Sequence, residues 1–289
     1  MPTIADPKPL STETVREDIV RALAEDLGEG DPTAALVGES VQACATVIAR
    51  EPAVLCGTAW FEMAFQAFDA NATISWEASD GDAIAAEQRI CTISGTARAL
   101  LSAERTALNL LQTLSGTATT AHRYRERIAD LPVTLLDTRK TIPGLRSAQK
   151  YAIRCGGASN HRMGLYDAIL IKENHLAMFD SLSAAFNAAR ELFPKLSVEI
   201  EVEHLHQLEE ALTAGVDIVL LDNFTVQAMR EAVALRNNRN SKTLLEASGG
   251  ITLDNIRAVA ETGVNRIAIG ALTKDLRAID LSMRMEMVG

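Results

Sequence analysis

The sequence lacks the features that mark nucleic-acid coats, membrane proteins and exported proteins. Its 28 lysines and arginines are outnumbered by 38 aspartates and glutamates, which gives a formal net charge of −10. Nucleic acids and anionic membranes bind extended basic faces, so neither is expected as a partner. No apolar run reaches the roughly 18 residues of a membrane-spanning helix, and residues 1–6 do not begin a signal segment. We therefore expect a cytoplasmic protein.

Cysteine is scarce, and neither cysteine nor histidine shows a metal-binding spacing. No C-x-x-C pair occurs, and all four cysteines lie in or near apolar runs: Cys44, Cys56, Cys91 and Cys155. We expect buried thiols in a reducing compartment rather than disulfides or a zinc site. No H-x-x-x-H or H-E-x-x-H motif is present, so four histidines are interpreted as ordinary polar residues: His122, His175, His204 and His206.

The composition is that of a globular chain with a sizeable core, since hydrophobic residues make up 47% of the 289 positions. After Ser11, apolar residues recur at helical spacing from Val15 to Leu23, which predicts an N-terminal helix capped by Ser11. Strand-like runs follow, interrupted by a helical stretch around 60–69, at roughly 41–51, 53–60, 72–79 and 88–97. Together they predict a small N-terminal α/β sandwich domain over residues 1–103.

The second part of the chain alternates helices with short apolar strands. Residues 104–124 are expected to form a long helix. Six strands are predicted after it, at 133–139, 168–172, 197–203, 217–222, 244–248 and 266–270. This alternation predicts parallel strands with right-handed crossovers. Because a closed barrel of the common type needs more than six strands, residues 104–274 form either an incomplete six-stranded α/β barrel or an open doubly wound sheet.

The carboxyl ends of these strands favour the barrel. Each carries a charge or a glycine-rich turn: Arg139 with Lys140, Lys172, Glu201, Asp222, Ser248-Gly249-Gly250, and Gly270 with Ala271. A barrel brings such ends to one rim, where barrel enzymes have their active sites. Beyond residue 274, apolar residues at 276, 279, 283 and 287 predict a helix over 275–289 that packs back on the first domain.

A basic stretch predicts an anion-binding site. From Arg139 to Lys172 the chain carries seven basic side chains and one acidic one, Asp167, in an otherwise acidic protein. His161 and Arg162 lie in the loop before the predicted strand that ends at Lys172, and arginine forms two-point contacts with carboxylates and phosphates. We interpret the stretch as a site for a small polyanion.

Acidic residues at strand ends predict the opposite side of this site. Alternation along 198–203 places Glu199, Glu201 and Glu203 on one face of a strand. Either these carboxylates face the barrel interior and meet cations or a metal, or the strand is an edge strand with a solvated acidic face. Glu201 and Asp222 could hold Mg²⁺ or accept hydrogen bonds from sugar hydroxyls, and these roles are not separable here.

Two glycine-rich turns complete the pattern. Ser248-Gly249-Gly250 and Gly270-Ala271 each join a predicted strand to a helix. Free backbone amides and the helix dipole at such turns bind phosphate, and neighbouring late strands of a barrel commonly share one phosphate. Tight turns without a ligand are the plainer interpretation of either turn alone, and two consecutive turns make it weaker.

Six motifs, in this order, resemble one known family: Thr138-Arg139-Lys140-Thr141-Ile142-Pro143-Gly144-Leu145-Arg146, Asn160-His161-Arg162-Met163-Gly164-Leu165, Ile171-Lys172-Glu173-Asn174-His175, Glu199-Ile200-Glu201-Val202-Glu203, Leu221-Asp222-Asn223-Phe224 and Glu246-Ala247-Ser248-Gly249-Gly250-Ile251. The family is quinolinate phosphoribosyltransferase, also called nicotinate-nucleotide pyrophosphorylase (carboxylating), of the type II phosphoribosyltransferases. The resemblance runs from Glu25 to Gly270. Ala158 departs from it, because a third glycine is more usual there.

The resemblance implies an α/β N-terminal domain, an incomplete α/β barrel and a homodimer with shared active sites, which could assemble further into a hexamer. It implies transfer of phosphoribosyl from 5-phosphoribosyl-1-pyrophosphate to quinolinate, which yields nicotinate mononucleotide, CO₂ and pyrophosphate in the biosynthesis of NAD. The implied cofactor is Mg²⁺, held directly or through water by Glu201 and Asp222.

The resemblance also implies residue roles. Quinolinate would be bound by Arg139, His161, Arg162, Lys172 and, from the neighbouring subunit, Arg105. The phosphoribosyl and phosphate groups would be bound by Thr138, Lys140, Glu201, Asp222, Ser248, Gly249, Gly250, Gly270 and Ala271. Lys140, Glu201 and Asp222 would be catalytic, because carboxylates offset positive charge on the ribose while Lys140 and Mg²⁺ neutralise the leaving pyrophosphate. Arg105 is predicted in the first turn of the long helix, where a cation opposes the helix dipole.

Three other functions fit parts of the pattern. A Schiff-base aldolase would use Lys172 at the end of its strand, opposite the phosphate turns. A nicotinate phosphoribosyltransferase would bind a substrate with one carboxylate fewer. A ligand sensor of the same fold would bind without turnover. The arginine cluster has no clear task in an aldolase, and the order of the motifs favours the carboxylating enzyme.

Overall fold

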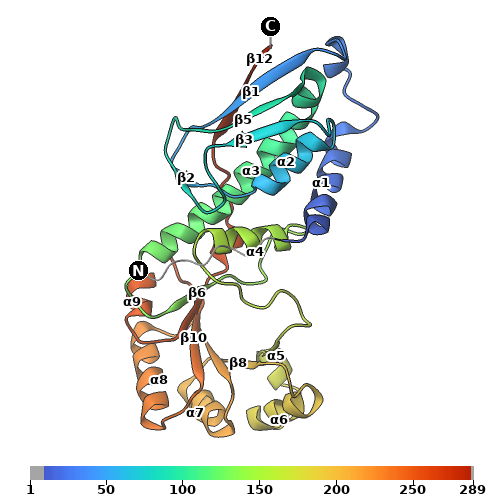
Figure 1. The fold of residues 1–289 in the computed structure, drawn as a ribbon. Coiled ribbons are helices and arrows are strands. Elements are labelled where there is room, and N and C mark those ends of the chain that lie inside the picture. Colours follow the sequence, from blue (N-terminus) through green and yellow to red (C-terminus); the bar gives the residue numbers. More distant parts are fainter. Residues whose placement is uncertain (1–9, 288–289) are drawn as a thin grey trace. The chain divides into compact units, whose positions relative to one another are not determined.

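The computed structural model describes residues 10–287 and divides into two compact units (Figure 1). Unit 1 comprises the chain up to residue 122, residues 141–157 and the chain from residue 271 on, and unit 2 comprises 123–140 and 158–270. This division differs from the domain boundary predicted at residue 103. Most of the long helix α3 (Ala97–Glu126) and all of α4 (Arg146–Cys155) belong to unit 1. Unit 1 is thus built from three separate stretches of sequence.

Unit 1 contains an antiparallel sheet with the strand order β12-β1-β5-β3. Its strands are β1 (Gln42–Ala49), β3 (Thr73–Trp76), β5 (Arg89–Thr96) and β12 (Leu281–Met287). Alternate residues of β1 are buried, among them Ala43, Ala45 and Val47, so one face of the sheet packs on the core. A separate ribbon pairs β2 (Ala53–Val54) with β4 (Ala83–Ile84).

Helices supply the rest of the core of unit 1. They are α1 (Thr12–Leu27), the 3-10 turn η1 (Ala34–Leu36), α2 (Thr58–Gln66), α3, α4 and α10 (Ala271–Lys274). The Ser11 hydroxyl accepts from the backbone N–H of Thr14, which confirms the predicted cap of α1. The predicted strand 53–60 is wrong beyond Val54, because the chain turns at Gly57 and α2 begins at Thr58.

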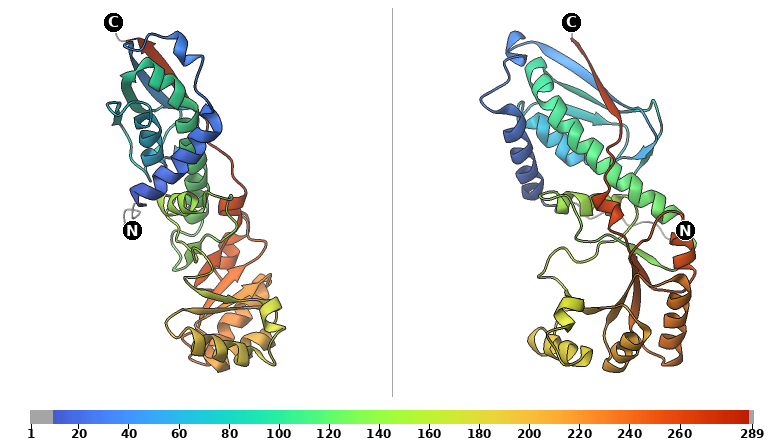
Figure 2. Two further views of the ribbon diagram at one scale, coloured as in Figure 1. Left: turned by 90° about the vertical axis from the view of Figure 1, so that its right-hand side faces the viewer. Right: turned by 180° about the vertical axis from the view of Figure 1, so that it is seen from behind.

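The helix predicted for 275–289 is also wrong. Residues 281–287 form β12, which pairs with β1 from Ala49↔Leu281 to Ala43↔Met287 (Figure 2). Apolar residues recur here at every second position from Leu281, which is the period of a strand and not the three-to-four-residue spacing of a helix. The segment belongs to unit 1.

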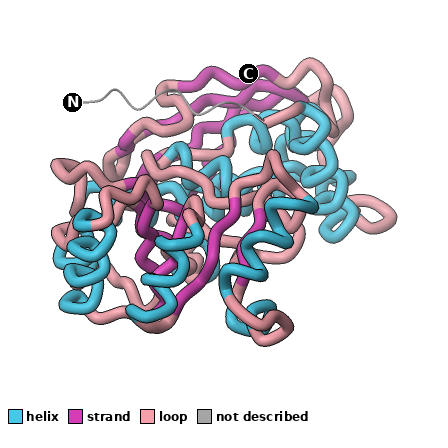
Figure 3. Tube along the Cα trace, turned by 90° about the horizontal axis from the view of Figure 1, so that it is seen from below, coloured by secondary structure: helices cyan, strands magenta, loops and turns pink. Residues whose placement is uncertain are grey.

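Unit 2 is a parallel sheet of six strands in the order β6-β11-β10-β9-β8-β7, with helices between them (Figure 3). The strands are β6 (Thr134–Leu136), β7 (Ile169–Ile171), β8 (Val198–Val202), β9 (Ile218–Asp222), β10 (Leu244–Ser248) and β11 (Arg266–Ala268). The helices are α5 (Glu173–Leu176), α6 (Leu182–Leu192), α7 (Leu205–Ala214), α8 (Val226–Asn238) and α9 (Ile256–Ala260).

All six predicted strands of unit 2 are confirmed, as is their parallel direction. From β7 to β11 the strands follow their order in the chain, and β11 pairs with β6, the first strand of the unit, as in a barrel rather than a doubly wound sheet. Because β6 and β7 do not pair within the described part of the chain, the barrel is incomplete. At the β6 end the chain adds a further paired segment, because Ser159 bridges to Leu136 in parallel.

Within residues 10–287, no helix is both long enough and apolar enough to cross a membrane. Cys56, Cys91 and Cys155 are buried as predicted, whereas Cys44 is only partly buried, so the prediction is wrong for this residue.

Candidate active site

A cavity of about 170 Å³ opens at the carboxyl ends of the strands of unit 2. Nine of the predicted site residues line it: Thr138, Arg139, Lys140, His161, Arg162, Lys172, Glu201, Asp222 and Ser248. The remaining lining residues are Leu170, Leu220, Glu246 and Ala268. The parallel sheet explains this convergence, because it brings the ends of all its strands to one rim.

The segment before Arg162 is held against β6 by a buried carboxylate. The backbone N–H of Ser159 donates to the carbonyl of Leu135 at 2.8 Å, so residues near 159 run alongside β6. Asp137, fully buried at the end of β6, accepts from the backbone N–H of His161 at 2.8 Å and from the side chain of Asn160 at 2.7 Å. Asp137 therefore fixes His161 and Arg162 relative to Arg139, although sequence analysis assigned it no role.

Two guanidinium groups form the cationic wall of the cavity. Arg162 is steadied by a hydrogen bond from its Nη1 to the carbonyl of Ala168 at 3.2 Å. Burial, together with the neighbouring positive charge of Arg139, lowers the pKa of Arg162. The charge of Arg139 therefore raises the cost of keeping Arg162 cationic, and a bound anion would offset this cost. The forked geometry of the two groups suits a ligand with two carboxylates.

Lys172 and Glu201 join the cationic and acidic walls. Lys172 Nζ lies 2.5 Å from Glu201 Oε2. Burial raises the pKa of Glu201, with smaller contributions from Glu173 and Asp222, and the Lys172 ammonium opposes this rise. Because Glu201 is 8% exposed and lies on a central strand, the alternative of a solvated acidic edge strand is wrong. Of the three alternating glutamates, only Glu203 is exposed.

The acidic wall and one glycine turn lie at the same level of the sheet. Asp222 at the end of β9 is the register partner of Ser248 at the end of β10. Gly249 follows with φ of +92°, and a Cβ there would come within 2.1 Å of the side-chain oxygen of Asn223. Only glycine fits at such a place. The turn is therefore pressed against the chain just beyond Asp222.

The second glycine turn lies next to Lys140. A Cβ on Gly270 would approach Lys140 Cδ to 2.9 Å and the hydroxyl oxygen of Thr138 to 3.6 Å. The Thr138 hydroxyl also accepts from the backbone N–H of Lys140 at 3.1 Å. Gly270 is the last residue of unit 2, while Ala271 begins α10 in unit 1. Gly270, Thr138 and Lys140 are thus brought together as predicted from their motifs.

A network of buried charges lies beneath the cationic wall. His161 Nε2 is 2.9 Å from Glu199 Oε2 and 3.4 Å from Glu246 Oε1, and Arg266 Nε is 2.8 Å from Glu246 Oε2. Glu246 is fully buried and Glu199 is 4% exposed. Burial alone would lower the pKa of His161, but hydrogen bonds and charges from Glu199 and Glu246 outweigh it and raise the pKa to about 9. Burial raises the pKa of Glu246.

One contact in this network favours a neutral ring. The backbone N–H of Arg162 lies 2.7 Å from His161 Nδ1, the atom that carries a proton in the cationic ring. A protonated Nδ1 would point its hydrogen at this N–H, so the contact fits a ring whose proton is on Nε2, between Glu199 and Glu246.

Sequence analysis missed Asp137, Glu199, Glu246 and Arg266 as members of the site. Signals for two of them were present. A glutamate interrupts the apolar strand 244–248, and Glu199 shares a strand face with Glu201. No sequence signal marked Arg266 or Asp137 as members of the site, because their partners are distant in sequence and adjacent only in space.

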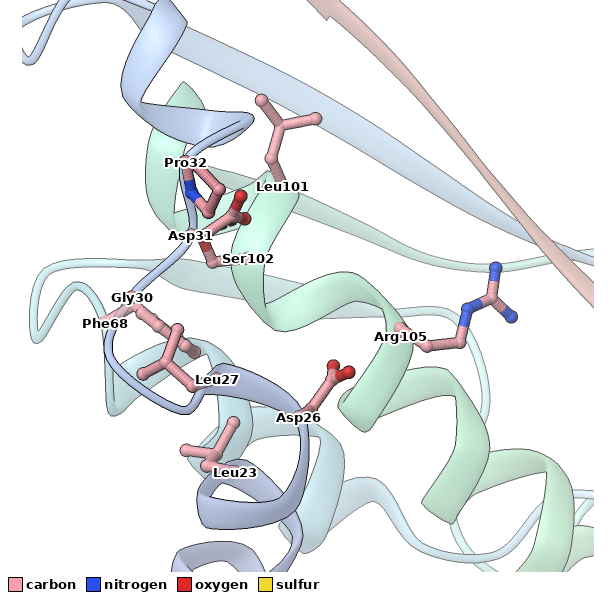
Figure 4. Close-up of a pocket in the computed structure, with 10 residues that line it drawn as sticks. All are labelled: Leu23, Asp26, Leu27, Gly30, Asp31, Pro32, Phe68, Leu101, Ser102 and Arg105. Carbon is pink, nitrogen blue, oxygen red and sulfur yellow. Dashed lines mark hydrogen bonds between the residues drawn. The ribbon is translucent and has the colours of Figure 1, made fainter.

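Arg105 belongs to unit 1 and lines a different pocket there (Figure 4). It lies well inside α3, which begins at Ala97, so its predicted position in the first turn is wrong and the dipole argument does not apply. Its side chain is 61% exposed, and the guanidinium extends away from Asp26 and the other labelled residues. Asp31 accepts from the Ser102 hydroxyl at 2.9 Å, which ties the loop after α1 to α3 beside Arg105.

The acidic wall has the chemistry of a Mg²⁺ site. Mg²⁺ prefers oxygen ligands and is commonly held by one or two carboxylates together with substrate phosphates and water. Glu201 and Asp222 present carboxylates from neighbouring strands, and the charge of Asp222 helps to raise the pKa of Glu201. Such mutual repulsion is what a bound cation would relieve. The residues present therefore fit this ion.

Similarity to known proteins extends over most of the chain and is not confined to the site. Two family models match it in succession: "Quinolinate phosphoribosyl transferase, N-terminal domain" over residues 31–115 and "Quinolinate phosphoribosyl transferase, C-terminal domain" over 117–284. A nicotinate-nucleotide pyrophosphorylase (carboxylating) from Mycobacterium leprae is 39% identical over 278 residues, which cover 94% of this chain and 97% of the relative.

Solved structures show the same agreement. The nicotinate-nucleotide pyrophosphorylase from Francisella tularensis superimposes with a TM-score of 0.92 at 42% identity, covering 96% of this chain and 98% of the other. NadC from Streptococcus pyogenes gives a TM-score of 0.93 at 36% identity, covering 98% of this chain and all of the other. With both of its domains matched and its charged pocket at the expected rim, the chain belongs to the quinolinate phosphoribosyltransferase family.

Proposed function

We propose that this protein transfers the phosphoribosyl group of 5-phosphoribosyl-1-pyrophosphate to the ring nitrogen of quinolinate. The products are nicotinate mononucleotide, pyrophosphate and the CO₂ lost from the ring carbon next to that nitrogen. Membership of the family and the names of its full-length relatives support this activity. The step serves the biosynthesis of NAD.

One observation carries the proposal: a single pocket has an arginine-rich wall on one side and a carboxylate wall with glycine turns on the other. The first wall suits a planar dicarboxylate, and the second suits a phosphorylated sugar. Substrates held in this way have their reacting atoms in line, which removes much of the entropic cost of the reaction. We assign quinolinate to Arg139, His161, Arg162 and Lys172.

The phosphoribosyl donor would occupy the opposite wall. We assign its contacts to Thr138, Lys140, Glu201, Asp222, Ser248, Gly249, Gly250, Gly270 and Ala271. Departure of pyrophosphate leaves positive charge on the ribose, which Glu201 and Asp222 can offset, while Lys140 neutralises the leaving group. We propose Mg²⁺ as the cofactor. Glu201 and Asp222 would hold it, and it would supply charge to the phosphates.

We further propose that the active enzyme is a homodimer with shared sites, to which Arg105 of the neighbouring subunit contributes. An apolar groove of about 430 Å³ along β7, the end strand of the sheet, supports this proposal. Exposed apolar residues line it: Leu165, Phe179, Leu192 and Phe193. Patches of this kind commonly mark protein interfaces. The Arg105 side chain is 61% exposed and its Nη2 lies 3.8 Å from Glu104 Oε1, so it could turn from this contact to a partner chain in the same assembly.

Four free cysteines support the predicted reducing, cytoplasmic compartment.

The direct test measures pyrophosphate and CO₂ released from quinolinate, phosphoribosyl pyrophosphate and Mg²⁺. Equal amounts of both products are expected. Turnover of nicotinate in preference to quinolinate would instead indicate a nicotinate phosphoribosyltransferase. Binding without product would indicate a ligand sensor. Borohydride trapping of a phosphosugar on Lys172 would indicate an aldolase, which the engagement of Lys172 by Glu201 disfavours.

A further inference from the structure

A fully buried amide side chain in unit 1 joins two segments that are distant in sequence. Gln149 of α4 is completely shielded from solvent. Its side-chain oxygen accepts from the backbone N–H of Ile142 at 2.8 Å, and its side-chain nitrogen donates to the carbonyl of Thr273 at 2.8 Å. Neither partner belongs to the helix that carries Gln149. Both ends of the amide are therefore satisfied, as a buried polar group requires.

Each partner of Gln149 lies a few residues beyond a residue assigned to the phosphoribosyl donor. Ile142 is two residues after Lys140, and Thr273 is three residues after Gly270. Both stretches begin where the chain passes from unit 2 into unit 1, and Gln149, Ile142 and Thr273 all belong to unit 1. One side chain thus holds the continuations of both Lys140 and Gly270.

The spacing between Lys140 and Gly270 leaves little tolerance. A Cβ on Gly270 would approach Lys140 Cδ to 2.9 Å, so the turn packs directly against the lysine side chain. A lysine ammonium and the backbone amides of a turn can share one phosphate only when each lies within roughly 2.7–3.2 Å of its oxygens. A change in the path of either segment would therefore break one of these contacts.

A purely local role at the start of α4 does not account for the contacts of Gln149. The loop before α4 has other anchors, because Arg146 Nε donates to the Thr141 hydroxyl at 3.1 Å and Arg21 Nη2 donates to the carbonyl of Gly144 at 3.0 Å. The second hydrogen bond of Gln149 reaches a residue 124 positions away and does nothing for the start of the helix. An apolar side chain would fill the same space without burying an amide.

We propose that Gln149 is a positioning residue for the phosphoribosyl donor, which fixes the distance between Lys140 and the turn at Gly270 so that both face one phosphate group. The inference rests on the proposed function for the identity of that donor. Because it is fully buried, Gln149 contacts no substrate itself and acts through the backbone of the two segments. These contacts exist before the donor binds, so the phosphate site needs no reorganisation.

Calorimetric binding measurements on the whole protein test this role for each ligand separately. In Gln149→Met a side chain of similar length replaces the amide and removes both hydrogen bonds, while every charge of the pocket is kept. We expect the dissociation constant of inorganic pyrophosphate, measured with Mg²⁺, to rise by roughly tenfold, the effect of about one lost hydrogen bond. The dissociation constant of quinolinate should stay unchanged, because its assigned residues are not held by Gln149.

Gln112→Met is the matched control. Gln112 lies in α3 of the same unit, and its side chain donates to the carbonyl of Leu281 at 3.4 Å. The control makes the same chemical change and should leave both dissociation constants as in the unmodified protein. A merely structural Gln149 would lower the melting temperature without changing pyrophosphate affinity, or would weaken both ligands alike, and either result would overturn the proposal.

Kinetics complete the test. In Gln149→Met the KM for phosphoribosyl pyrophosphate should rise by a similar factor, and the KM for quinolinate should not. Should Gln149→Met fail to fold, Gln149→Asn makes the same comparison, because it keeps the amide but is one methylene too short to reach both partners. Absence of product from the unmodified protein would reject the proposed function, while the comparison of pyrophosphate affinities would still decide the role of Gln149.

Discussion

At the scale of single residues, the pocket keeps its cations and its carboxylates on opposite walls, with one bridge between them. Arg139 and Arg162 stand on one wall, and Asp222 on the other. Lys172 and Glu201 form the bridge at 2.5 Å. Substitutions on the two walls should therefore affect different kinetic constants.

Removal of the shared arginine tests the cationic wall. Arg105→Ala should raise the KM for quinolinate by roughly 10- to 100-fold, the effect of losing a hydrogen bond to a charged group, and leave fold and dimer intact. Arg123→Ala, an exposed arginine of the same helix, serves as the control and should behave as the unmodified enzyme. Steady-state kinetics and sedimentation measure both. Unchanged kinetics in Arg105→Ala would remove the shared-site claim.

Removal of the carboxylates tests the opposite wall. Glu201→Ala and Asp222→Ala should lower kcat by roughly two orders of magnitude, because they stabilise charge that develops only in the transition state. Their effect on quinolinate binding should be weaker. The comparison variant is Glu203→Ala, just beyond the same strand and exposed. If quinolinate affinity alone were lost, the assignment of the two walls would have to be reversed.

How far the sequence predicts single residues depends on whether their signal is local. Arg139, Lys172 and Asp222 could be found because each closes an apolar run, and a strand end is visible in the sequence. Arg266 could not, since it begins its strand and its partner Glu246 lies on another. Asp137 looks like one more polar residue after β6 until the loop that it holds is seen.

At the scale of elements, β9 could be predicted because residues 218–221 form a continuous apolar run buried on both faces, and β8 because apolar residues and glutamates alternate along it with the period of a strand. Errors occurred where two periods fit one segment. Residues 281–287 satisfy both the strand period and the helical spacing, and only the free edge of β1 decides between them. Residues 53–60 failed for a different reason, because Gly57 adopts a φ of +114° and ends the extended chain.

Substitutions in β12 distinguish the two periods. Met285→Asp should lower the free energy of unfolding by roughly 1–3 kcal/mol, because Met285 packs against the core of unit 1. Its neighbour Arg284 is exposed on the other face of the strand, and Arg284→Asp should change stability by less than about 0.5 kcal/mol. Denaturant unfolding gives both values. Equal losses in the two variants would contradict the alternation.

At the scale of the whole molecule, the proposed assembly needs two copies of the chain to complete each pocket. The groove along β7 offers an apolar surface for this contact, and an isologous contact repeats it on both subunits. Neither the groove nor the surface that it would contact could be predicted from sequence. The exposure of the apolar side chains in the groove depends on which strand lies at the end of the sheet.

Mixing two inactive variants tests the sharing of sites. Arg105→Ala and Arg162→Ala should each be nearly inactive at low quinolinate concentration. When the two are refolded together, a mixed dimer contains one pocket with both defects and one with neither, so random pairing of equal amounts should restore about a quarter of the activity. Each variant refolded alone is the control. No recovery, with mixed dimers demonstrated by mass, would show that each pocket uses its own Arg105.

β12 borders β1, although the two strands are far apart in the sequence. A ribosome therefore exposes β1 well before the strand that covers its outer edge. Until then the row of peptide groups along that edge of β1 is open to any passing chain. Gly116 allows residues 277–278 to cross α3 at close range on their way to β1, because a Cβ there would come within 2.2 Å of the carbonyl oxygen of Arg277. A bulkier residue at this crossing would hinder the pairing of β12 with β1 and leave this edge of the sheet open to association with other chains.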